Sequence, residues 1–378
     1  MQNLDKRESL KGFSFIQIAR FGFSSGRKVN DGTMKKAGTI FLVCLAIGLY
    51  FFANKQASVS GVAKNPEAVF ISDTVISNSP SMKFSTLDTA DYIRRVMHLA
   101  HDSIAKHWPI LSVYPQAGAV LPYYRIVAMY GNFYSKHMGI LGRLPEEELI
   151  DLLNKEMKEW EEADTLTPVK PAIHYIAITA QNNPGKGGTY RLRMPDSQIE
   201  KAISLSGKIN GITFLDVQVG HSTVQNEVPT LEKYLLNPNV HLGLDPEWSM
   251  KDGSVPATKI GSLDASDINF AIEYLSELVR KNELTPKILV VHRFTKAMVT
   301  NYKDIKPTPQ VQVVINMDGF GFPAKKEDSY RRFVGGMPIQ FTGFKLFYKN
   351  DILTPPYRMM TPWEILKLYP KPIYIQYQ

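Results

Sequence analysis

Residues 212–248 read ITFLDVQVGHSTVQNEVPTLEKYLLNPNVHLGLDPEW, in which two short apolar runs flank a polar segment. Short β-branched runs followed by helical patterns continue from Tyr124 to the last residue. Such alternation is typical of parallel βαβ units, and eight strands predict closure into a (β/α)8 TIM barrel. An open doubly wound sheet is the alternative, but no Gly-rich dinucleotide fingerprint follows the first strand. The predicted strands are Arg125–Tyr130, Ala172–Ala180, Ile212–Val219, Val240–Glu247, Ile288–Phe294, Val311–Asp318, Ile339–Phe347 and Ile373–Tyr377.

Helix start signals stand between these strands. Pro145 followed by three glutamates places proline and acids at a helix N-terminus. Asp264 can cap a helix whose apolar residues recur every three or four positions, and Pro362 opens a last short helix. Before the barrel, apolar residues at helical spacing predict a helix over about 87–107 that packs on it.

Polar residues share one phase near the C-terminal ends of six strands, whereas the alternate positions stay apolar. Residues two apart on a strand point to the same face. Active sites of such barrels lie at the C-terminal ends of the strands, so these residues predict a polar, acid-rich cavity there. The set consists of Asp216, Gln218, Asp245, Glu247, His292, Asn316, Asp318, Lys345 and Gln376.

Paired carboxylates are what glycosidic cleavage requires: one protonates the leaving oxygen, and the other attacks the anomeric carbon or activates water. We predict Asp245 as nucleophile or base and Asp318 as acid, with Glu247 as the competing acid. An alternative for each acid is a capping role, which Pro246 after Asp245 also fits. The predicted substrate-binding residues are Asp216, Gln218, His292, Asn316, Lys345 and Gln376, with Trp248 and Tyr348 placed to stack on a sugar.

Other chemistries fit the sequence less well. There is no Gly-x-Ser-x-Gly elbow and no His-Glu-x-x-His zinc helix. A metal site built from His174, Asp216, Asp245 and His292 is an alternative, but His174 is expected to face away from the others. We therefore expect no cofactor and no metal. Two long loops, 181–194 and 249–263, are expected on the active face.

The N-terminal region has a different character from the barrel. Residues 37–53 are uncharged and apolar and follow Lys35–Lys36, so they predict a signal anchor or a signal peptide. Residues 1–36 would be a basic cytoplasmic tail, 54–86 a linker, and 87–378 the barrel domain with its helix. The domain is thus expected outside the cytoplasm, in the periplasm or at the cell surface, anchored to the membrane or secreted.

Net charge argues against a nucleic-acid partner. The chain carries +8, but residues 1–53 hold eight basic and three acidic residues, which leaves only +3 for the rest. A nearly balanced domain has no strong electrostatic footprint for a polyanion. The single cysteine, Cys44, lies in the apolar segment, so the domain has no disulfide and no thiolate ligands.

Four phrases carry a resemblance to known proteins: GLDPEW at 243–248, VVH at 290–292, NMDG at 316–319 and the closing YIQYQ at 374–378. They resemble a family of uncharacterised bacterial secreted or lipoprotein-type proteins. The layout is also similar to glycoside-hydrolase barrels with acids on strands four and six. It departs from the large group with its nucleophile on strand seven, where Lys345 stands.

Two functions follow as expectations. The first is an extracytoplasmic glycoside hydrolase-like enzyme that acts on a polysaccharide or envelope glycan through paired carboxylates. The second is a non-catalytic barrel of the cell envelope that binds glycans or acts as a scaffold. Carboxylates a few ångströms apart across a cleft would favour the enzyme, and buried or salt-bridged acids would favour the scaffold.

Overall fold

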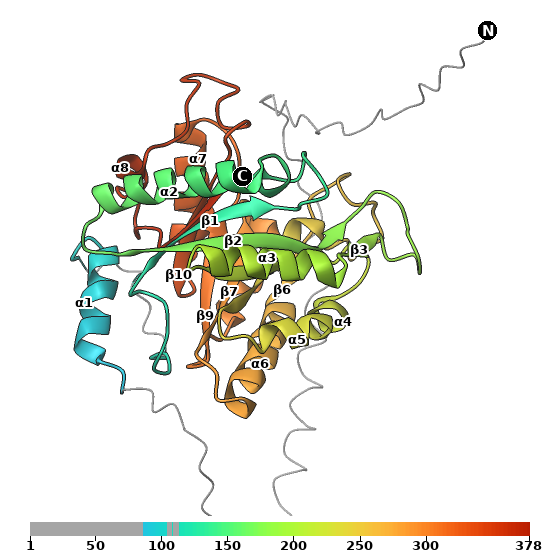
Figure 1. Ribbon diagram of the computed structural model, residues 1–378, viewed down its shortest axis with the longest axis horizontal. Coiled ribbons are helices and arrows are strands. Elements are labelled where there is room, and N and C mark those ends of the chain that lie inside the picture. The colour runs from blue at the N-terminus through green and yellow to red at the C-terminus, as the bar shows by residue number, and fades with distance from the viewer. Residues whose placement is uncertain (1–85, 104–107, 109–112) are drawn as a thin grey trace, which may run out of the picture. The chain divides into compact units, whose positions relative to one another are not determined.

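The computed structural model describes residues 86–103, 108 and 113–378. Eight parallel strands form a closed barrel, because β1 pairs with β2 on one side and with β11 on the other (Figure 1). Closure confirms the predicted TIM barrel and excludes the open sheet. The barrel strands are β1 (Arg125–Gly131), β2 (Val169–Ala180), β4 (Ile212–Val217), β5 (Val240–Leu244), β7 (Lys287–Arg293), β9 (Val311–Met317), β10 (Phe341–Leu346) and β11 (Tyr374–Tyr377).

Helices follow most strands and cover the outside of the barrel. The connection between β7 and β9 holds no α-helix but two short 3-10 helices, η4 (Lys296–Met298) and η5 (Tyr302–Asp304), with the strand β8 (Val299–Thr300) between them. This strand pairs with β6 (Leu263–Asp264) outside the barrel. A short strand, β3 (Arg191–Arg193), pairs antiparallel with the C-terminal end of β2. The covering helices are α2 (Glu146–Ala163), α3 (Asp196–Lys208), α4 (Val224–Glu227), α5 (Glu232–Leu235), α6 (Ala265–Lys281), α7 (Pro323–Tyr330) and α8 (Pro362–Ile365).

The predicted start signals act where they stand in the sequence. Pro145 precedes α2, and the three glutamates form its first turn, where they complement the helix dipole. Asp264 caps α6 in a capping box with Asp267. Thr361 caps α8, whose first residue is Pro362.

Two apolar layers result from side-chain alternation along the strands. One phase, exemplified by Leu215 and Val217, packs against the helices. The other phase, exemplified by Phe214 and Val290, fills the N-terminal half of the barrel interior. Strand residues of either phase are therefore buried, and only their position along the strand separates an apolar core from a polar site.

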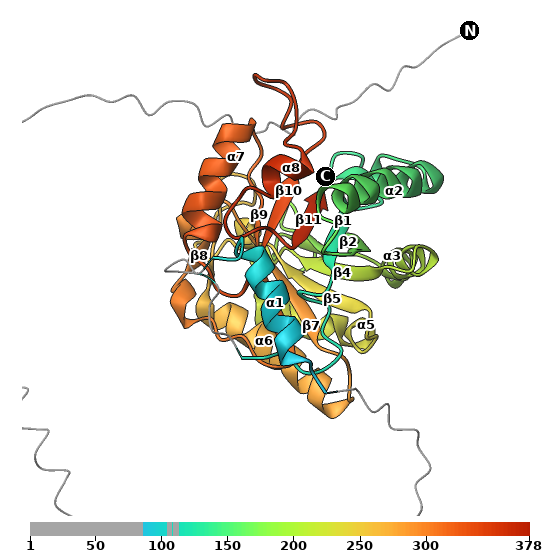
Figure 2. The same cartoon turned by 90° about the vertical axis from the view of Figure 1, so that its left-hand side faces the viewer.

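The helix α1 (Thr89–Leu99) closes the N-terminal end of the barrel, and in Figure 2 it crosses in front of the strands. Tyr92 and Leu99 are buried in the same cluster as Ile126 and Ile212 from the strand beginnings. The predicted helix over 87–107 is therefore present and packs on the barrel as expected, but it ends at Leu99.

The predicted membrane segment at 37–53 and nearly all of the 54–86 linker lie outside the described residues. Among the residues that are described, no helix is long and apolar enough to cross a membrane. The anchor and the extracytoplasmic location remain predictions.

Candidate functional site

Polar side chains fill the C-terminal half of the barrel interior. The predicted phase holds, because the polar residues are buried inside while their neighbours Leu215 and Ile315 face the helices. Glu247, on the 3-10 helix η3 (Pro246–Trp248), is half-buried. The fully enclosed members of the predicted set are Asp216, Gln218, Asp245, His292, Asn316, Asp318, Lys345 and Gln376.

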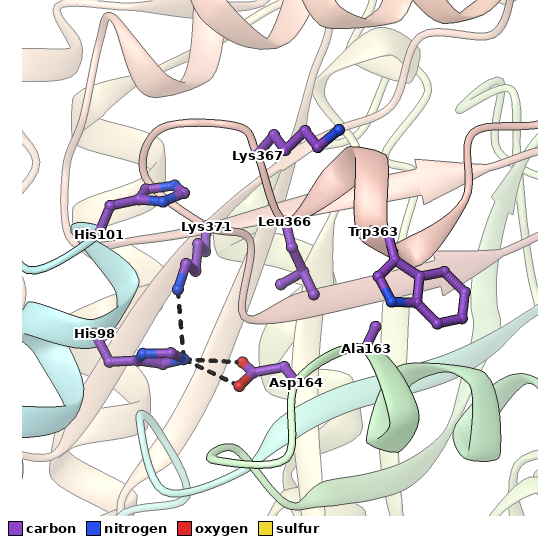
Figure 3. Close-up of a pocket in the computed structure, with 8 residues that line it drawn as sticks. All are labelled: His98, His101, Ala163, Asp164, Trp363, Leu366, Lys367 and Lys371. Carbon is purple, nitrogen blue, oxygen red and sulfur yellow. Dashed lines mark hydrogen bonds and ion pairs between the residues drawn. The ribbon is translucent and has the colours of Figure 1, made fainter.

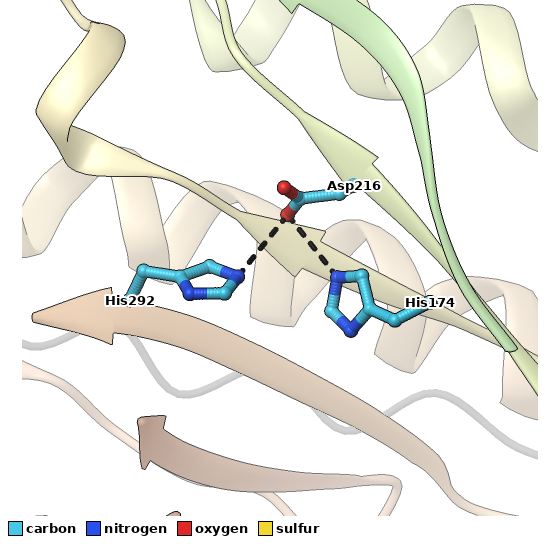
Figure 4. Close-up of side chains that lie close together, drawn as sticks. All are labelled: His174, Asp216 and His292. Atoms are coloured by element: carbon cyan, nitrogen blue, oxygen red, sulfur yellow. Dashed lines mark ion pairs between the residues drawn. The ribbon is translucent and has the colours of Figure 1, made fainter. Parts of the chain in front are cut away.

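Three side chains from β2, β4 and β7 point at one another inside the barrel (Figure 4). His174 Nε2 and His292 Nε2 lie 3.4 and 3.6 Å from the same oxygen, Asp216 Oδ1. The expected orientation of His174 was wrong. Tyr175 and Ala177 take the helix-facing phase of β2, so His174 points inward.

The far atom of each of these three side chains has its own partner. These contacts fix the two imidazole rings and the carboxylate in orientation, as second partners commonly do in binding sites. They join Tyr130 Oη to Asp216 Oδ2 at 2.9 Å, Tyr374 Oη to His174 Nδ1 at 2.6 Å, and His292 Nδ1 to Asp318 Oδ2 at 2.9 Å.

Asp318 lies between two cationic groups. Lys345 Nζ is 2.9 Å from Oδ1, and His292 holds the other oxygen. Burial raises the pKa of Asp318, but Lys345 and His292 outweigh burial and bring that pKa below its ordinary value. Lys345 is itself positioned, since Lys326 Nζ donates to its backbone oxygen at 2.7 Å and its own Nζ lies over the Tyr130 ring.

The pKa values of Asp245 and Glu247 are shifted upward, in the opposite direction to that of Asp318. Burial, helped by nearby carboxylates, raises the pKa of Asp245 to about 7 and that of Glu247 to about 8. Gln218 donates to Asp245 Oδ2 at 3.3 Å. Asp245 occupies the N-cap position of η3, but its side chain makes no capping hydrogen bond, so the capping alternative does not account for it.

The pKa values of the two central histidines, His174 and His292, are shifted in opposite directions. Burial lowers the pKa of His174 to about 4. Burial opposes the charge on His292 as well, but Asp318 and Asp216 raise its pKa to about 10. Burial raises the pKa of Asp216, yet His292 and His174 bring it well below its ordinary value. At neutral pH His292 is therefore an imidazolium between two carboxylates.

The structure corrects one predicted stacking residue. Tyr348 lies on the helix side, where its hydroxyl donates to Glu156 of α2 at 3.0 Å and its ring stacks on Tyr377. A strand-end position alone could not show this, because the chain turns away from the barrel axis after β10. Trp248 is half-buried on η3, beside Glu247.

Two tyrosines of the site were missed. Tyr130 and Tyr374 both contact the central cluster. Each stands two residues from another inward position, Ala128 and Gln376 respectively, so the phase argument could have found them. They were overlooked because a tyrosine in a strand is more often a core residue than a binding residue. Asn316 and Gln376 join the network from the remaining side, with Gln376 Nε2 donating to Tyr374 Oη at 2.9 Å.

The two long loops lie on the same face, as predicted. His221, which follows β4, links them. Its backbone N–H donates to Thr189 of the first loop at 2.8 Å, and its ring contacts Ser254 of the second loop at 2.8 Å. The first loop is partly regular, because its last residues form β3.

A surface pocket lies at the other end of the barrel, between α1, α2 and the α8 region (Figure 3). Its polar wall is Asp164, which His98 contacts at 3.0 Å, with Lys371 3.5 Å from the same imidazole nitrogen. His98 is therefore tied to the barrel, and His101 contacts the carbonyl of Leu368. His98 and His101, three residues apart on the chain, thus have separate partners.

Fold and site together define a (β/α)8 barrel with a buried, acid-rich C-terminal interior. No family model matches the sequence, and no curated protein matches it. Among solved structures, the chain is similar to GH26C from Muricauda sp. MAR_2010_75, at 9% identity over 70% of this chain and 76% of that one, with a TM-score of 0.30. Neither the sequence identity nor the TM-score is high enough to transfer an activity to this chain.

Proposed function

We propose that this protein is a hydrolase of a polysaccharide or envelope glycan, that it acts outside the cytoplasm, and that it uses paired carboxylates. One observation carries the proposal. Beyond the strand ends a carboxylate held in its charged form, Asp318, lies within electrostatic range of two carboxyl groups whose pKa values are raised, Asp245 and Glu247. Carboxyl groups whose pKa values differ in this way can take separate acid and base roles at neutral pH.

The roles follow from the contacts and differ from those expected from the sequence: Asp318 takes the role expected of Asp245, and the competing acid Glu247 takes that of the acid. Asp318, with Lys345 and His292 each 2.9 Å away, is the nucleophile or base. Glu247 is the general acid, since it is half-buried where a leaving group can reach it and is protonated at neutral pH. Asp245 helps to keep the proton on Glu247, because the negative charge that Asp245 gains as pH rises through about 7 raises the pKa of its neighbour.

The second candidate, a non-catalytic glycan-binding or scaffolding barrel, also has an observation in its favour. Asp216 and Asp318 are both buried and ion-paired, which a purely structural polar core would show as well. The two functions differ in whether the acids take part in catalysis, so substitution of Glu247 and of Asp318 separates them.

The test is hydrolysis by the full chain of a panel of envelope and plant polysaccharides. Glu247→Gln and Asp318→Asn should each lower kcat/KM by about 10²- to 10⁴-fold. Asp252→Asn is the matched control, because Asp252 is an exposed acid on the 249–263 loop that pairs with the exposed Lys259. Activity should fall as pH rises through about 8, where Glu247 loses its proton. If no polysaccharide is cleaved, and glycan binding survives both substitutions, the catalytic proposal is wrong and the non-catalytic glycan-binding barrel is favoured.

A further inference from the structure

Three buried side-chain atoms without a hydrogen-bond partner converge in the barrel. They are His174 Nε2, Asp216 Oδ1 and His292 Nε2, and all three residues are 0% exposed. The nitrogen–oxygen separations of 3.4 and 3.6 Å are longer than a normal hydrogen bond. Buried polar atoms are nearly always satisfied, so three that meet at one point need a common partner.

The far atoms of these side chains orient them for such a partner. A proton on Nδ1 of each imidazole, donated to Tyr374 and to Asp318, leaves both Nε2 lone pairs facing Asp216 Oδ1. Tyr130 occupies the other oxygen of Asp216. Metal-binding histidines commonly donate their second nitrogen to a carboxylate or another oxygen, and binding carboxylates are hydrogen-bonded in turn.

The separations fit a small cation. All three atoms lie within 4.8 Å of one another. Ligands at about 2.1 Å around a tetrahedral ion lie roughly 3.4 Å apart, close to the two distances found. Gly243 on β5 adjoins them, since a Cβ there would lie 2.4 Å from Asp216 Oδ1 and 2.6 Å from His174 Nε2. Glycine thus lets the ligand atoms approach the strand.

The charge of the surroundings suits a dication. Four carboxyl groups, Asp216, Asp245, Glu247 and Asp318, lie near one another at this end of the barrel, and Lys345 pairs with Asp318. Such an excess of buried acid requires either bound protons or a bound metal ion.

We propose that His174, Asp216 and His292 bind one divalent transition-metal ion of the zinc type. Two imidazoles and one carboxylate suit zinc and its neighbours, whereas calcium and magnesium prefer oxygen ligands alone. The ion would contact the two Nε2 atoms and Asp216 Oδ1, with Nδ1 of His292 directed at Asp318. This goes beyond the proposed function, which depends on Asp318 and Glu247 and needs no metal.

The experiment is a zinc titration of the full chain after treatment with a chelator. We expect one zinc ion bound per chain, and a Co²⁺ derivative with a visible spectrum of nitrogen and oxygen ligation. His174→Gln, His292→Gln and Gly243→Ala should each abolish this binding. The matched control is His241→Gln, because His241 is also buried in the barrel but contacts the Ile288 backbone instead.

A milder pair of variants guards against simple misfolding. Tyr374→Phe keeps the ring and removes the hydroxyl that holds His174, so zinc affinity should fall about 10- to 100-fold. Tyr377→Phe, whose hydroxyl contacts Trp160 on the helix side, should leave affinity unchanged. No zinc binding by the wild type, or binding equal in wild type and the His292→Gln variant, would overturn the proposal. Hydrolysis is not measured here, so failure of the proposed function would be seen separately.

Discussion

The two ends of the barrel both bury charge, but they do so differently. At the N-terminal end Arg125 contacts Asp164 at 2.9 Å, His98 contacts the same carboxylate at 3.0 Å, and Arg125 also lies over the Trp160 ring. At the C-terminal end the carboxyl groups Asp216, Asp245, Glu247 and Asp318 outnumber the fixed cation Lys345 that pairs with Asp318. The first arrangement is electrostatically balanced, and the second is not.

The difference indicates which end serves stability and which serves chemistry. A buried charge with an opposite partner can be retained at little net cost, whereas like charges buried together destabilise the folded state. Such destabilising arrangements persist at functional sites, where shifted pKa values are useful. Substitutions at the two ends should therefore have different effects on stability and on activity.

The largest expected effect is at the C-terminal end. Asp318→Asn removes the charged carboxylate between Lys345 and His292 and should slow glycan hydrolysis by about 10⁴-fold, roughly 5.5 kcal/mol on the barrier. The measurement is kcat/KM on the best substrate of the panel. A rate within tenfold of wild type would remove Asp318 from the mechanism.

The next effect belongs to the N-terminal end. Arg125→Met leaves the buried carboxylate of Asp164 without its guanidinium and should lower the free energy of unfolding by about 3–5 kcal/mol. Urea denaturation measures this change. Arg331→Met is the matched control, because the Arg331 ion pair with Asp328 is exposed and should contribute less than about 1 kcal/mol. Equal losses in the two variants would refute the balanced-end interpretation.

A third prediction concerns Asp245 and the direction of its titration. Burial raises its pKa from an ordinary 3.8 to about 7, so the folded state retains a proton that the unfolded state has lost. Stability contributed by this proton is present below about pH 4 and is lost as pH rises to about 7. In chelator-treated protein, Asp245→Asn should therefore gain about 2–4 kcal/mol over wild type between these pH values. A difference independent of pH would contradict the shifted pKa.

The smallest effect has the opposite sign and lies at the N-terminal end. Burial raises the pKa of Asp164, but His98 and Arg125 bring it below its ordinary 3.8. Its contribution is thus present above about pH 4 and is lost as pH falls, by about 1 kcal/mol per pH unit. Urea denaturation at about pH 4 and about pH 3 should show a smaller acid loss in Arg125→Met than in wild type. An identical loss would show that Arg125 does not lower this pKa.

Much of the site could be predicted because phase along a strand is a local property. Asp216, His292, Asn316 and Lys345 were placed inward from their apolar neighbours alone, and each is buried in the barrel. His174 was misjudged because on a strand buried on both faces the two phases look alike: Tyr175 and Ala177 face the helices, yet tyrosine and alanine occur on either side. Tyr348 was misjudged because it lies beyond the strand end, where alternation no longer applies.

The sequence by itself determined the eight strands, the capped helices and the collection of polar residues at one end, because periodicity, capping and strand direction are set by neighbouring residues. Only the tertiary structure decided which acids bear charge. Asp245, Glu247 and Asp318 are similar as residues, but Lys345 comes from a strand about a hundred residues after Asp245, and it contacts Asp318. Ionisation depends on the distance in space to such partners and on burial, and neither is encoded locally.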